Sequence, residues 1–553
     1  MFNKVDLNKV KGNTKEQKII SGGGWGLRQA VHNDGDNKIS VYELPVKEYG
    51  TYKVTVKLQG KGLVRLFTNR RNLVSRDIKL IEGEDKTLTF AVNVTEYIPA
   101  ITSIPYEDKS IYVSVCGDAS VTEFEAISES VPVLYVAGDS TLTDQMSLAP
   151  YYQKNTCGGW AQMMEQYFSD VAVCNFAHSG LTTNCFKDDG HLDIVLKHIK
   201  PGDYFMLQFG HNDQKRRNLA AFSGYINNLR WYVSLIRKKG ATPIICSPIS
   251  RIPIDDEQYG TKVSLLSAHA LACKQASIEL NVPFIDLHEL TFNQWLEFGD
   301  ATPNYFMDAT HTNDFGAQLI AEFVASELTK LNVEGLSDKV IPINLATEHP
   351  DENTPIAPAE PAKPGPFAEP IPYVDIKDDP LFPKLQEAYR GELLDPCIMH
   401  LHPNDDMPRA QLLMVLFKAL RISGVRPYNG HYVDIARYEW DSSFVEACIV
   451  ENLIGKAPWD ISSDDRFRPD DPLTYGEFAS FCIRGIQSDK SKRDIDWITC
   501  FNQAKEKHII KSDAAANAPI RRAEVYAGLV EVMNLLNTKD MDLPEGMEIH
   551  PVS

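Results

Sequence analysis

Four short apolar runs between residues 131 and 250 constrain the fold of this chain more than any other feature. They lie at residues 133–137, 171–177, 204–209 and 243–246, and polar residues or glycine follow each of them at once. Short runs that are apolar on both faces are typical of strands in a parallel sheet that helices cover on both sides. The region from residue 131 to 335 is therefore predicted to be an α/β domain with a parallel sheet.

Candidate functional residues come directly after the first three runs. Ser140 lies in the turn Gly138-Asp139-Ser140-Thr141, Gly180 follows the second run, and Asn212 follows the third. Open α/β sheets bind their ligands at the carboxyl ends of the strands. A sharp strand-to-helix turn at Gly138 would expose the hydroxyl of Ser140 at this edge, which is where a nucleophile is expected.

An aspartate and a histidine occur late in the same region. Asp308 and His311 are three residues apart and precede an amphipathic stretch over residues 314–331, which is predicted to be a helix. Residues at this spacing can lie side by side on one turn. Acyl transfer requires a hydroxyl nucleophile, an imidazole base and a carboxylate that orients the imidazole. Ser140, His311 and Asp308 are accordingly the predicted catalytic residues.

A tetrahedral intermediate also needs hydrogen-bond donors aimed at its oxyanion. The backbone N–H groups of Ser140 and Gly180 and the side-chain amide of Asn212 are the candidates, and glycine permits close backbone approach. These residue types also have ordinary structural roles. Asparagine, for example, is frequent in turns. His178 and His211 flank these positions, and we expect them to pack rather than to bind substrate.

Taken in order, the blocks around Ser140, Gly180, Asn212 and Asp308 to His311 resemble the four blocks of the SGNH (GDSL-type) hydrolases. The longer strings at residues 137–144 and 209–214 look most like the rhamnogalacturonan acetylesterase branch. The resemblance implies a three-layer αβα, flavodoxin-like domain over residues 131–335 and a serine esterase that needs no cofactor and no metal. One departure is that Gly180 is followed by Leu-Thr-Thr, where that branch usually has Gly-Arg-Ser.

The segment before this domain alternates polar and apolar residues with the period of strands. The clearest examples lie at residues 38–44, 50–58, 63–68, 86–92 and 110–115. Short strands at this spacing predict a β-sandwich over residues 1–130. It resembles the jelly-roll, carbohydrate-binding-like domains that precede some esterases of this branch. It could hold sugar through aromatic residues such as Trp25, or it could be a structural cap, and the sequence leaves both open.

Residues 336–385 are predicted to be a linker, because the stretch from 346 is rich in proline, alanine and glutamate. The alternative is an ordered strap lying over the catalytic domain.

Residues 386–553 contain a weak internal repeat that resembles S-layer homology modules, which are helical hairpins that bind cell-wall polysaccharide in surface proteins. Arg409 and Arg522 match the arginine of their binding string and are the candidate wall-binding residues, whereas the middle copy has Tyr475 and the first copy lacks its front half. Repeats of this kind need one another to close a core, and we rate a structural or oligomerisation role slightly above wall anchoring.

Charge and cysteine content exclude some classes of partner. A formal charge of −19 argues against nucleic acid, and it disfavours strongly acidic polymers unless a local basic patch intervenes. The 10 cysteines form no Cys-x-x-Cys pair, so they are expected to be buried free thiols rather than metal ligands.

The start of the chain lacks the apolar region of a secretory signal, and no apolar stretch is long enough to span a membrane. As it stands the chain is expected to remain unexported, in the cytoplasm, while the repeats would fit a cell-surface protein whose signal had been removed.

The predicted function is removal of acetyl groups from a plant cell-wall polysaccharide of the rhamnogalacturonan or pectin type, or from its oligosaccharides. The alternatives are a lipase- or thioesterase-like hydrolase of the same fold and a non-catalytic carbohydrate-binding or wall-attached protein. The sugar position, the polymer size and the oligomeric state are left open.

Overall fold

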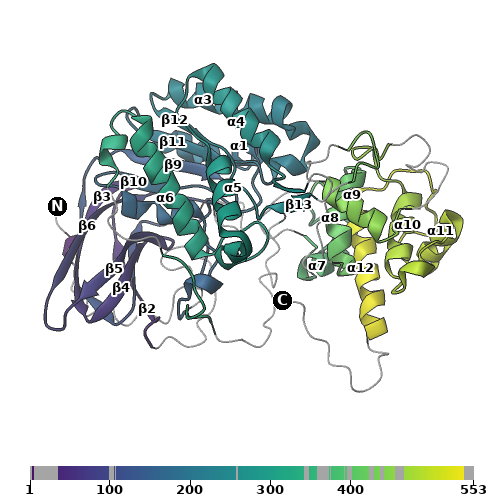
Figure 1. Cartoon of the computed structure of the whole chain (residues 1–553), viewed down its shortest axis with the longest axis horizontal. Coiled ribbons are helices and arrows are strands. Elements are labelled where there is room, and N and C mark those ends of the chain that lie inside the picture. Colours follow the sequence, from purple (N-terminus) through teal and green to yellow (C-terminus); the bar gives the residue numbers. More distant parts are fainter. Residues whose placement is uncertain are drawn as a thin grey trace. The chain divides into compact units, whose positions relative to one another are not determined.

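The computed structural model describes most of the chain. The described residues are 3–4, 35–98, 105, 107–147, 149–256, 260–341, 348–357, 373, 375–391, 393–394, 401–422, 429–435, 441–454 and 466–540. Contacts divide the chain into two compact units (Figure 1). One consists of residues 1–254 and 264–361, and the other of residues 255–263 and 362–553. Trp25 lies outside the described residues.

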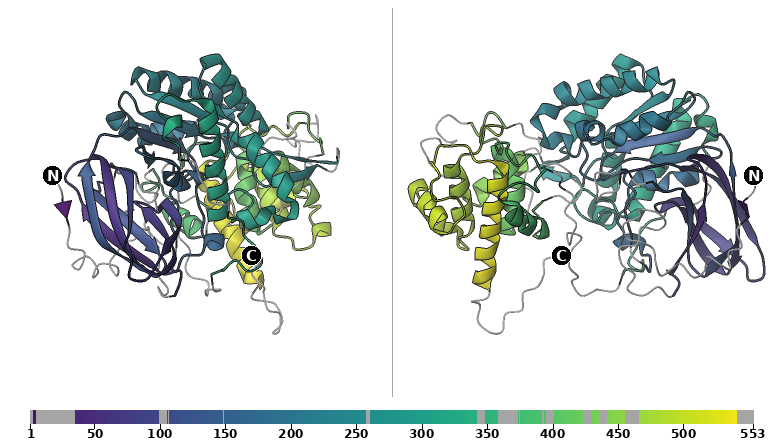
Figure 2. Two further views of the ribbon diagram at one scale, coloured as in Figure 1. Left: turned by 60° about the vertical axis from the view of Figure 1, so that its left-hand side comes forward. Right: turned by 180° about the vertical axis from the view of Figure 1, so that it is seen from behind.

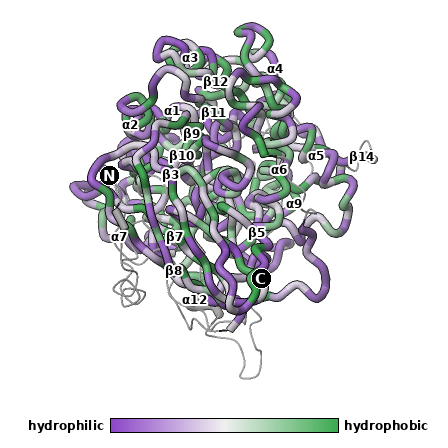
Figure 3. Tube along the Cα trace, turned by 90° about the vertical axis from the view of Figure 1, so that its left-hand side faces the viewer, coloured by the Kyte–Doolittle hydropathy of each residue, from purple (hydrophilic) through white to green (hydrophobic). Residues whose placement is uncertain are grey.

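The N-terminal strands of the first unit form two four-stranded antiparallel sheets, in the orders β1-β8-β3-β6 and β2-β7-β4-β5. The strands are β1 (Asn3–Lys4), β2 (Ile39–Pro45), β3 (Gly50–Gly60), β4 (Gly62–Thr68), β5 (Asn72–Leu80), β6 (Lys86–Val94), β7 (Ser110–Cys116) and β8 (Ala119–Ser128). Alternate residues such as Val54, Val56, Val113 and Val115 are fully buried in one core that both sheets share. The change of hydropathy along these strands can be followed in Figure 3. The strands β5 and β8 were not foreseen from the sequence.

The four apolar runs are strands of one parallel sheet, as the sequence predicted. The strands are β9 (Val133–Gly138), β10 (Ala172–Asn175), β11 (Tyr204–Gln208), β12 (Thr242–Cys246) and a short fifth strand, β15 (Phe284–Ile285). Their order is β10-β9-β11-β12-β15, and all neighbours are parallel. Numbered along the chain this order is 2-1-3-4-5, which is that of flavodoxin-like sheets.

Helices cover both faces of this sheet (Figure 1). They are α1 (Thr183–Asp188), α2 (His191–His198), α3 (Ile226–Lys238), α4 (Ser267–Leu280), α5 (Leu287–Phe298) and α6 (Asp314–Leu331). One face packs against α6, whose Ile320 and Val324 share a core with Leu134 and Val136 of β9. On the other face, Phe205 of β11 stacks on Tyr232 of α3. The amphipathic stretch predicted at residues 314–331 is the helix α6.

The turn between β4 and β5, residues 69–72, reaches from the N-terminal sheets into the hydrolase elements, which lie beside these sheets in both views of Figure 2. Arg71 is fully buried and forms an ion pair with Asp314, and it also donates to the carbonyl oxygen of Gln145 at 3.1 Å. Its neighbour Arg70 pairs with Asp144 at 3.0 Å. This turn, called the β4–β5 turn below, therefore contacts both the loop that follows Ser140 and the first residue of α6.

Part of the predicted linker is ordered against the first unit. Glu348 pairs with Arg65 and accepts a hydrogen bond from Gln153 at 2.9 Å. His349 contacts the hydroxyl of Tyr305 at 2.7 Å through its Nδ1 atom. Residues 348–357 thus follow the alternative considered from the sequence, an ordered strap on the first unit.

The second unit is helical, and its helices recur in pairs. The pairs are α7 (Phe382–Arg390) with α8 (Arg409–Leu420), α9 (Ser442–Val450) with α10 (Tyr475–Gly485), and α11 (Trp497–Glu506) with α12 (Arg522–Asp540). A two-stranded hairpin, β13 (Ile254–Asp256) and β14 (Thr261–Val263), is also present in the chain. The expectation that the first copy lacks its front half is wrong, because α7 takes that place and extends across residue 385.

A closed ring of backbone hydrogen bonds joins the three pairs just before α8, α10 and α12. The amide of Met407 donates to Ile520, that of Ile520 to Leu473, and that of Leu473 back to Met407, at 3.1, 2.9 and 2.8 Å. Each helical pair therefore bonds the other two. None of the helices among the described residues has the length and apolarity that crossing a membrane would require.

Candidate active site

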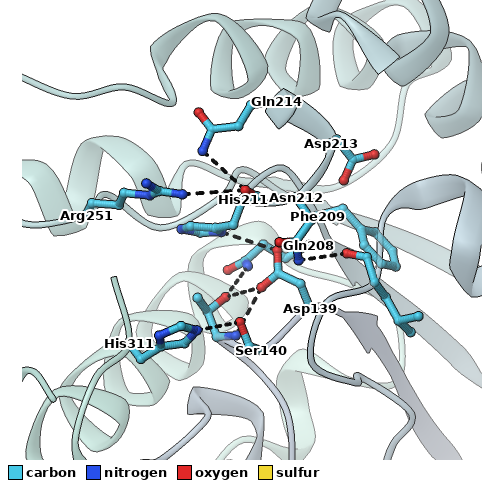
Figure 4. A network of polar contacts seen from close by, with 12 residues as sticks. Asp139, Ser140, Gln208, Phe209, His211, Asn212, Asp213, Gln214, Arg251 and His311 are labelled. Atoms are coloured by element: carbon cyan, nitrogen blue, oxygen red, sulfur yellow. Dashed lines mark hydrogen bonds and ion pairs between the residues drawn. The ribbon is translucent and has the colours of Figure 1, made fainter. Parts of the chain in front are cut away.

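The turn after β9 positions Ser140 at the carboxyl edge of the parallel sheet. A Cβ atom on Gly138 would lie 2.6 Å from the carbonyl oxygen of Gln208, so the close packing of β9 on β11 requires glycine here. The Oγ atom of Ser140 lies 2.8 Å from Nε2 of His311 (Figure 4). Ser140 is 9% exposed, so a small part of the residue remains accessible.

Asp308 holds the other side of the His311 ring. Its Oδ2 atom lies 2.7 Å from Nδ1 of His311, and its Oδ1 atom accepts the backbone amides of Thr310 and His311 at 2.6 and 2.7 Å. Burial alone would raise the pKa of Asp308, but these hydrogen bonds and the charge of His311 lower it to about 2. The carboxylate is therefore ionised at neutral pH and keeps the proton of the imidazole on Nδ1.

The loop that carries His311 is tied to the start of α6. The amide of Met307 donates to the carbonyl oxygen of His311 at 2.8 Å, which closes the loop. Asn313 caps the helix by accepting the amides of Phe315 and Gly316, both at 3.1 Å. This short connection makes the placement of His311 depend on the placement of α6.

A buried hydrogen-bonded network lies behind Ser140. It joins, in order, Trp160, Gln208, Thr141, Asp139 and His211, over distances of 3.0, 2.8, 2.8 and 3.3 Å. Burial would raise the pKa of Asp139, but the adjacent His211 ring lowers it, and burial lowers the pKa of His211. Asp139 is thus an anion that accepts from a neutral His211. His211 was expected to pack, and it does so as part of this network.

The three candidate oxyanion donors come from the ends of three neighbouring strands. Gly180 has a φ of +80°, which residues other than glycine rarely adopt. Within the part of the chain that the structure describes, the backbone amides of Ser140 and Gly180 have no hydrogen-bond acceptor. The Asn212 amide donates to Leu181 at 3.1 Å and accepts from Lys215 at 3.1 Å, so its orientation is set and one N–H remains for a ligand.

Arg251 was missed in the sequence. It follows β12 and Ser250, in the position after a strand end that Ser140, Gly180 and Asn212 occupy in their own strands. Its Nη2 atom lies 3.5 Å from the carbonyl oxygen of His211, and its Nε atom is buried without a partner among the described residues (Figure 4). Burial lowers the pKa of Arg251 to about 10, although Asp139 and Asp308 oppose this. The polar ending of the fourth apolar run was the signal that could have revealed it.

A second unforeseen group is Asp213, next to Asn212. It is completely buried, and its Oδ1 atom accepts the amide and hydroxyl of Thr183 at 2.9 and 2.6 Å. Burial raises the pKa of Asp213 to about 7. Among the described residues, no three His, Cys, Asp or Glu side chains gather as a metal site would require.

The structure places the two candidate wall-binding arginines at helix starts in the second unit. Arg409 is 5% exposed, pairs with Glu477 at 2.6 Å, and donates to the carbonyl oxygens of Phe467 and Arg468. This placement commits its guanidinium to contacts inside the helical unit rather than to a surface ligand. Arg522 begins α12 and is partly buried.

Comparison with known proteins places this site in a family. The model of the GDSL-like lipase/acylhydrolase family matches residues 136–319. The rhamnogalacturonan acetylesterase RhgT of Bacillus subtilis strain 168 is 33% identical over 217 residues, which are 36% of this chain and 90% of that protein. The chain belongs to the GDSL-like lipase/acylhydrolase family. It is a serine esterase.

The chain is also similar to other proteins. The probable rhamnogalacturonan acetylesterase YesY of the same strain is 29% identical over 38% of this chain and 94% of its own length. Among solved structures, the YxiM protein of Bacillus subtilis covers 54% of this chain and 82% of its own, at 23% identity and a TM-score of 0.34. The match to the family model and the order of the parallel strands show that the hydrolase region has the SGNH hydrolase fold with a parallel sheet and helices.

Proposed function

We propose that this protein is a carbohydrate esterase that removes acetyl groups from rhamnogalacturonan-type polysaccharide or its oligosaccharides. The observation that carries the proposal is the continuous contact from Ser140 through His311 to Asp308, at 2.8 and 2.7 Å. The names of the relatives RhgT and YesY support the substrate class.

In this proposal Ser140 is the nucleophile. As its oxygen bonds to the acetyl carbon, its proton moves to Nε2 of His311, and the charge formed on His311 is stabilised by Asp308. The carbonyl oxygen becomes an oxyanion that accepts hydrogen bonds from the amides of Ser140 and Gly180 and from the side chain of Asn212. His311 then returns the proton to the departing sugar hydroxyl, which leaves an acetylated Ser140.

Water completes the cycle. His311 removes a proton from the attacking water, the tetrahedral intermediate collapses, and acetate leaves while the proton returns to the Ser140 oxygen. This sequence consumes one ester and one water and yields one alcohol and one acetic acid. Apart from water, it uses only side chains and backbone amides of the chain itself.

The flanking segments have supporting roles in the proposal. Residues 1–130 are a β-sandwich that caps the catalytic domain of residues 131–335, and the contacts of Arg71 with Asp314 and Gln145 support this role. Residues 386–553 are S-layer-homology-like repeats with a structural role, which the internal contacts of Arg409 support.

The test is acetate release by the full chain from acetylated rhamnogalacturonan fragments, acetylated xylo-oligosaccharides, long-chain fatty esters and an acyl thioester. We expect acetylated rhamnogalacturonan to give the highest kcat/KM. Ser140→Ala should lower kcat by at least about 10,000-fold, as removal of such nucleophiles does elsewhere. Ser223→Ala, an exposed serine, is the control.

Two results would overturn the proposal in different ways. A higher kcat/KM on long-chain esters or on the thioester would make the protein a lipase- or thioesterase-like hydrolase. Turnover that is unchanged in Ser140→Ala would remove Ser140 from the mechanism.

A further inference from the structure

The guanidinium of Arg251 lies among the groups of the candidate active site without a carboxylate of its own. Figure 4 shows it pointing to His211, on the same side of the network as His311. Its single hydrogen bond there, to the carbonyl oxygen of His211, is long at 3.5 Å. No carboxylate among the described residues lies within ion-pair distance of it, although Asp139 and Asp308 are both near enough to act on its charge.

Each of those two nearby anions already has another partner. Asp139 accepts from Thr141 and His211, and Asp308 binds His311 and two backbone amides. Neither is therefore available to pair with Arg251 without giving up a contact that holds Ser140 or His311. A guanidinium carries five N–H donors in a planar fork, and leaving them unpaired at a partly buried position is costly.

Buried arginines in the described part of the chain differ in their partners. Arg71 pairs with Asp314, Arg409 with Glu477, and Arg493 with Glu451. Arg76 and Arg484 are buried too, and no described carboxylate forms an ion pair with either of them. What distinguishes Arg251 is its place in the candidate active site, next to His211.

We propose that Arg251 forms a subsite for a carboxylate of the substrate, so that the enzyme selects acetylated sugars that carry a uronic acid next to the acetylated position. The planar fork of arginine suits bidentate binding of a carboxylate. This inference rests on the proposed function, whose polymer already contains uronic acid, and it names the residue that would recognise that acid. It also gives a local cation to a chain whose formal charge of −19 would otherwise repel an acidic polymer.

The test compares three substrates on the full chain. They are an acetylated galacturonate-containing oligosaccharide, the same oligosaccharide with its carboxylates methyl-esterified, and the neutral ester p-nitrophenyl acetate. Wild type is expected to favour the free carboxylate over its methyl ester by about 10- to 100-fold in kcat/KM, the range for hydrogen bonds to charged groups. The difference should lie mainly in KM and shrink at high salt.

Arg251→Met should abolish this preference, so that its kcat/KM on the free acid falls to that on the methyl ester, since it removes a charge-assisted contact only for the anionic substrate. Arg251→Lys keeps the charge without the fork and should retain part of the preference. Arg230→Met is the matched control, because Arg230 forms an exposed ion pair with Glu279 on α3 and α4 and should keep the full preference.

The outcomes separate the subsite from the proposed function. A wild type that does not distinguish the acid from its methyl ester overturns the subsite and leaves the esterase intact. An equal loss of Arg251→Met on all three substrates also overturns it, because Arg251 would then only support the active-site loops. Failure of the proposed function would instead appear as poor turnover of both oligosaccharides by wild type, with good turnover of p-nitrophenyl acetate.

Discussion

The N-terminal sheets and the C-terminal helical unit each contain a buried arginine that forms an ion pair, but the partners of the two arginines lie in different parts of the fold. Arg71 leaves its own sheets and pairs with Asp314 of the hydrolase domain, three residues after His311. Arg409 stays within the helical unit and pairs with Glu477 of the next helical pair. Both arginines are nearly inaccessible to water. Arg71 links the N-terminal sheets to the hydrolase domain, whereas Arg409 links two helical pairs within the helical unit.

This difference concerns which flanking segment contacts the elements that carry the candidate catalytic residues. The β4–β5 turn touches the loop after Ser140 through Asp144 and Gln145, and the helix after His311 through Asp314. The two halves of the candidate active site are thereby tied to the N-terminal sheets. The helical unit has its own core and its own hydrogen-bonded ring, so its stability is expected to matter little for the esterase reaction.

The largest expected effect is that of Arg71→Met. Removing this guanidinium leaves the carboxylate of Asp314 buried without its cation, which typically costs about 3–5 kcal/mol of unfolding free energy. We expect that loss in urea unfolding, together with a fall in kcat, because α6 and His311 lose a support. A variant that keeps wild-type kcat would show that the N-terminal sheets do not position the active site.

Arg409→Met tests the buried ion pair of the helical unit. Glu477 would keep its capping contact with Thr474 but lose its cation, so the helical unit should lose about 3 kcal/mol of stability. Esterase kcat and KM should stay within about twofold of wild type at temperatures where the helical unit remains folded. A large fall in kcat at those temperatures would mean that Arg409, like Arg71, supports the active site.

Asp213→Asn tests a buried carboxyl group of the hydrolase domain that has no cation. Among the described residues Asp213 forms no ion pair, whereas the buried Asp314 pairs with Arg71. Its pKa of about 7 is raised by burial, so the folded state holds a proton that the unfolded state has released. Asp213 therefore lowers stability as pH rises from about 4, the unfolded pKa, to about 7. The variant should remove this slope and gain about 1–3 kcal/mol at pH 8. If the unfolding free energy of the variant changed between pH 5 and pH 8 as much as that of wild type, this role of Asp213 would be contradicted.

The smallest expected effect is that of Arg230→Met. Its ion pair with Glu279 at 2.6 Å is more than one-third exposed on both sides, so solvent and salt screen it. The variant should change the unfolding free energy by less than about 1 kcal/mol. A loss comparable to that of Arg71→Met would show that burial is not what separates these pairs.

Several parts of the fold could be read directly from local sequence. The runs ending near Ser140, Gly180 and Asn212 became neighbouring strands, because apolar runs of that length are stable only when helices cover both faces. The helix α6 was foreseen from its amphipathic period. The strands β5 and β8 and the helix α7 were missed, since their polar surface residues weaken the periodic signal that prediction depends on.

What this sequence by itself determined is the position of its parallel strands and the residue types that follow them, with a serine, a histidine and an aspartate expected at one edge of the sheet. Tertiary structure alone decided which arginine is paired. Arg71, Arg251 and Arg409 have nothing in their local sequence to distinguish them, because the partner of a buried charge comes from a distant part of the chain. Desolvation makes that distant partner important, since burying a guanidinium without an anion nearby is costly.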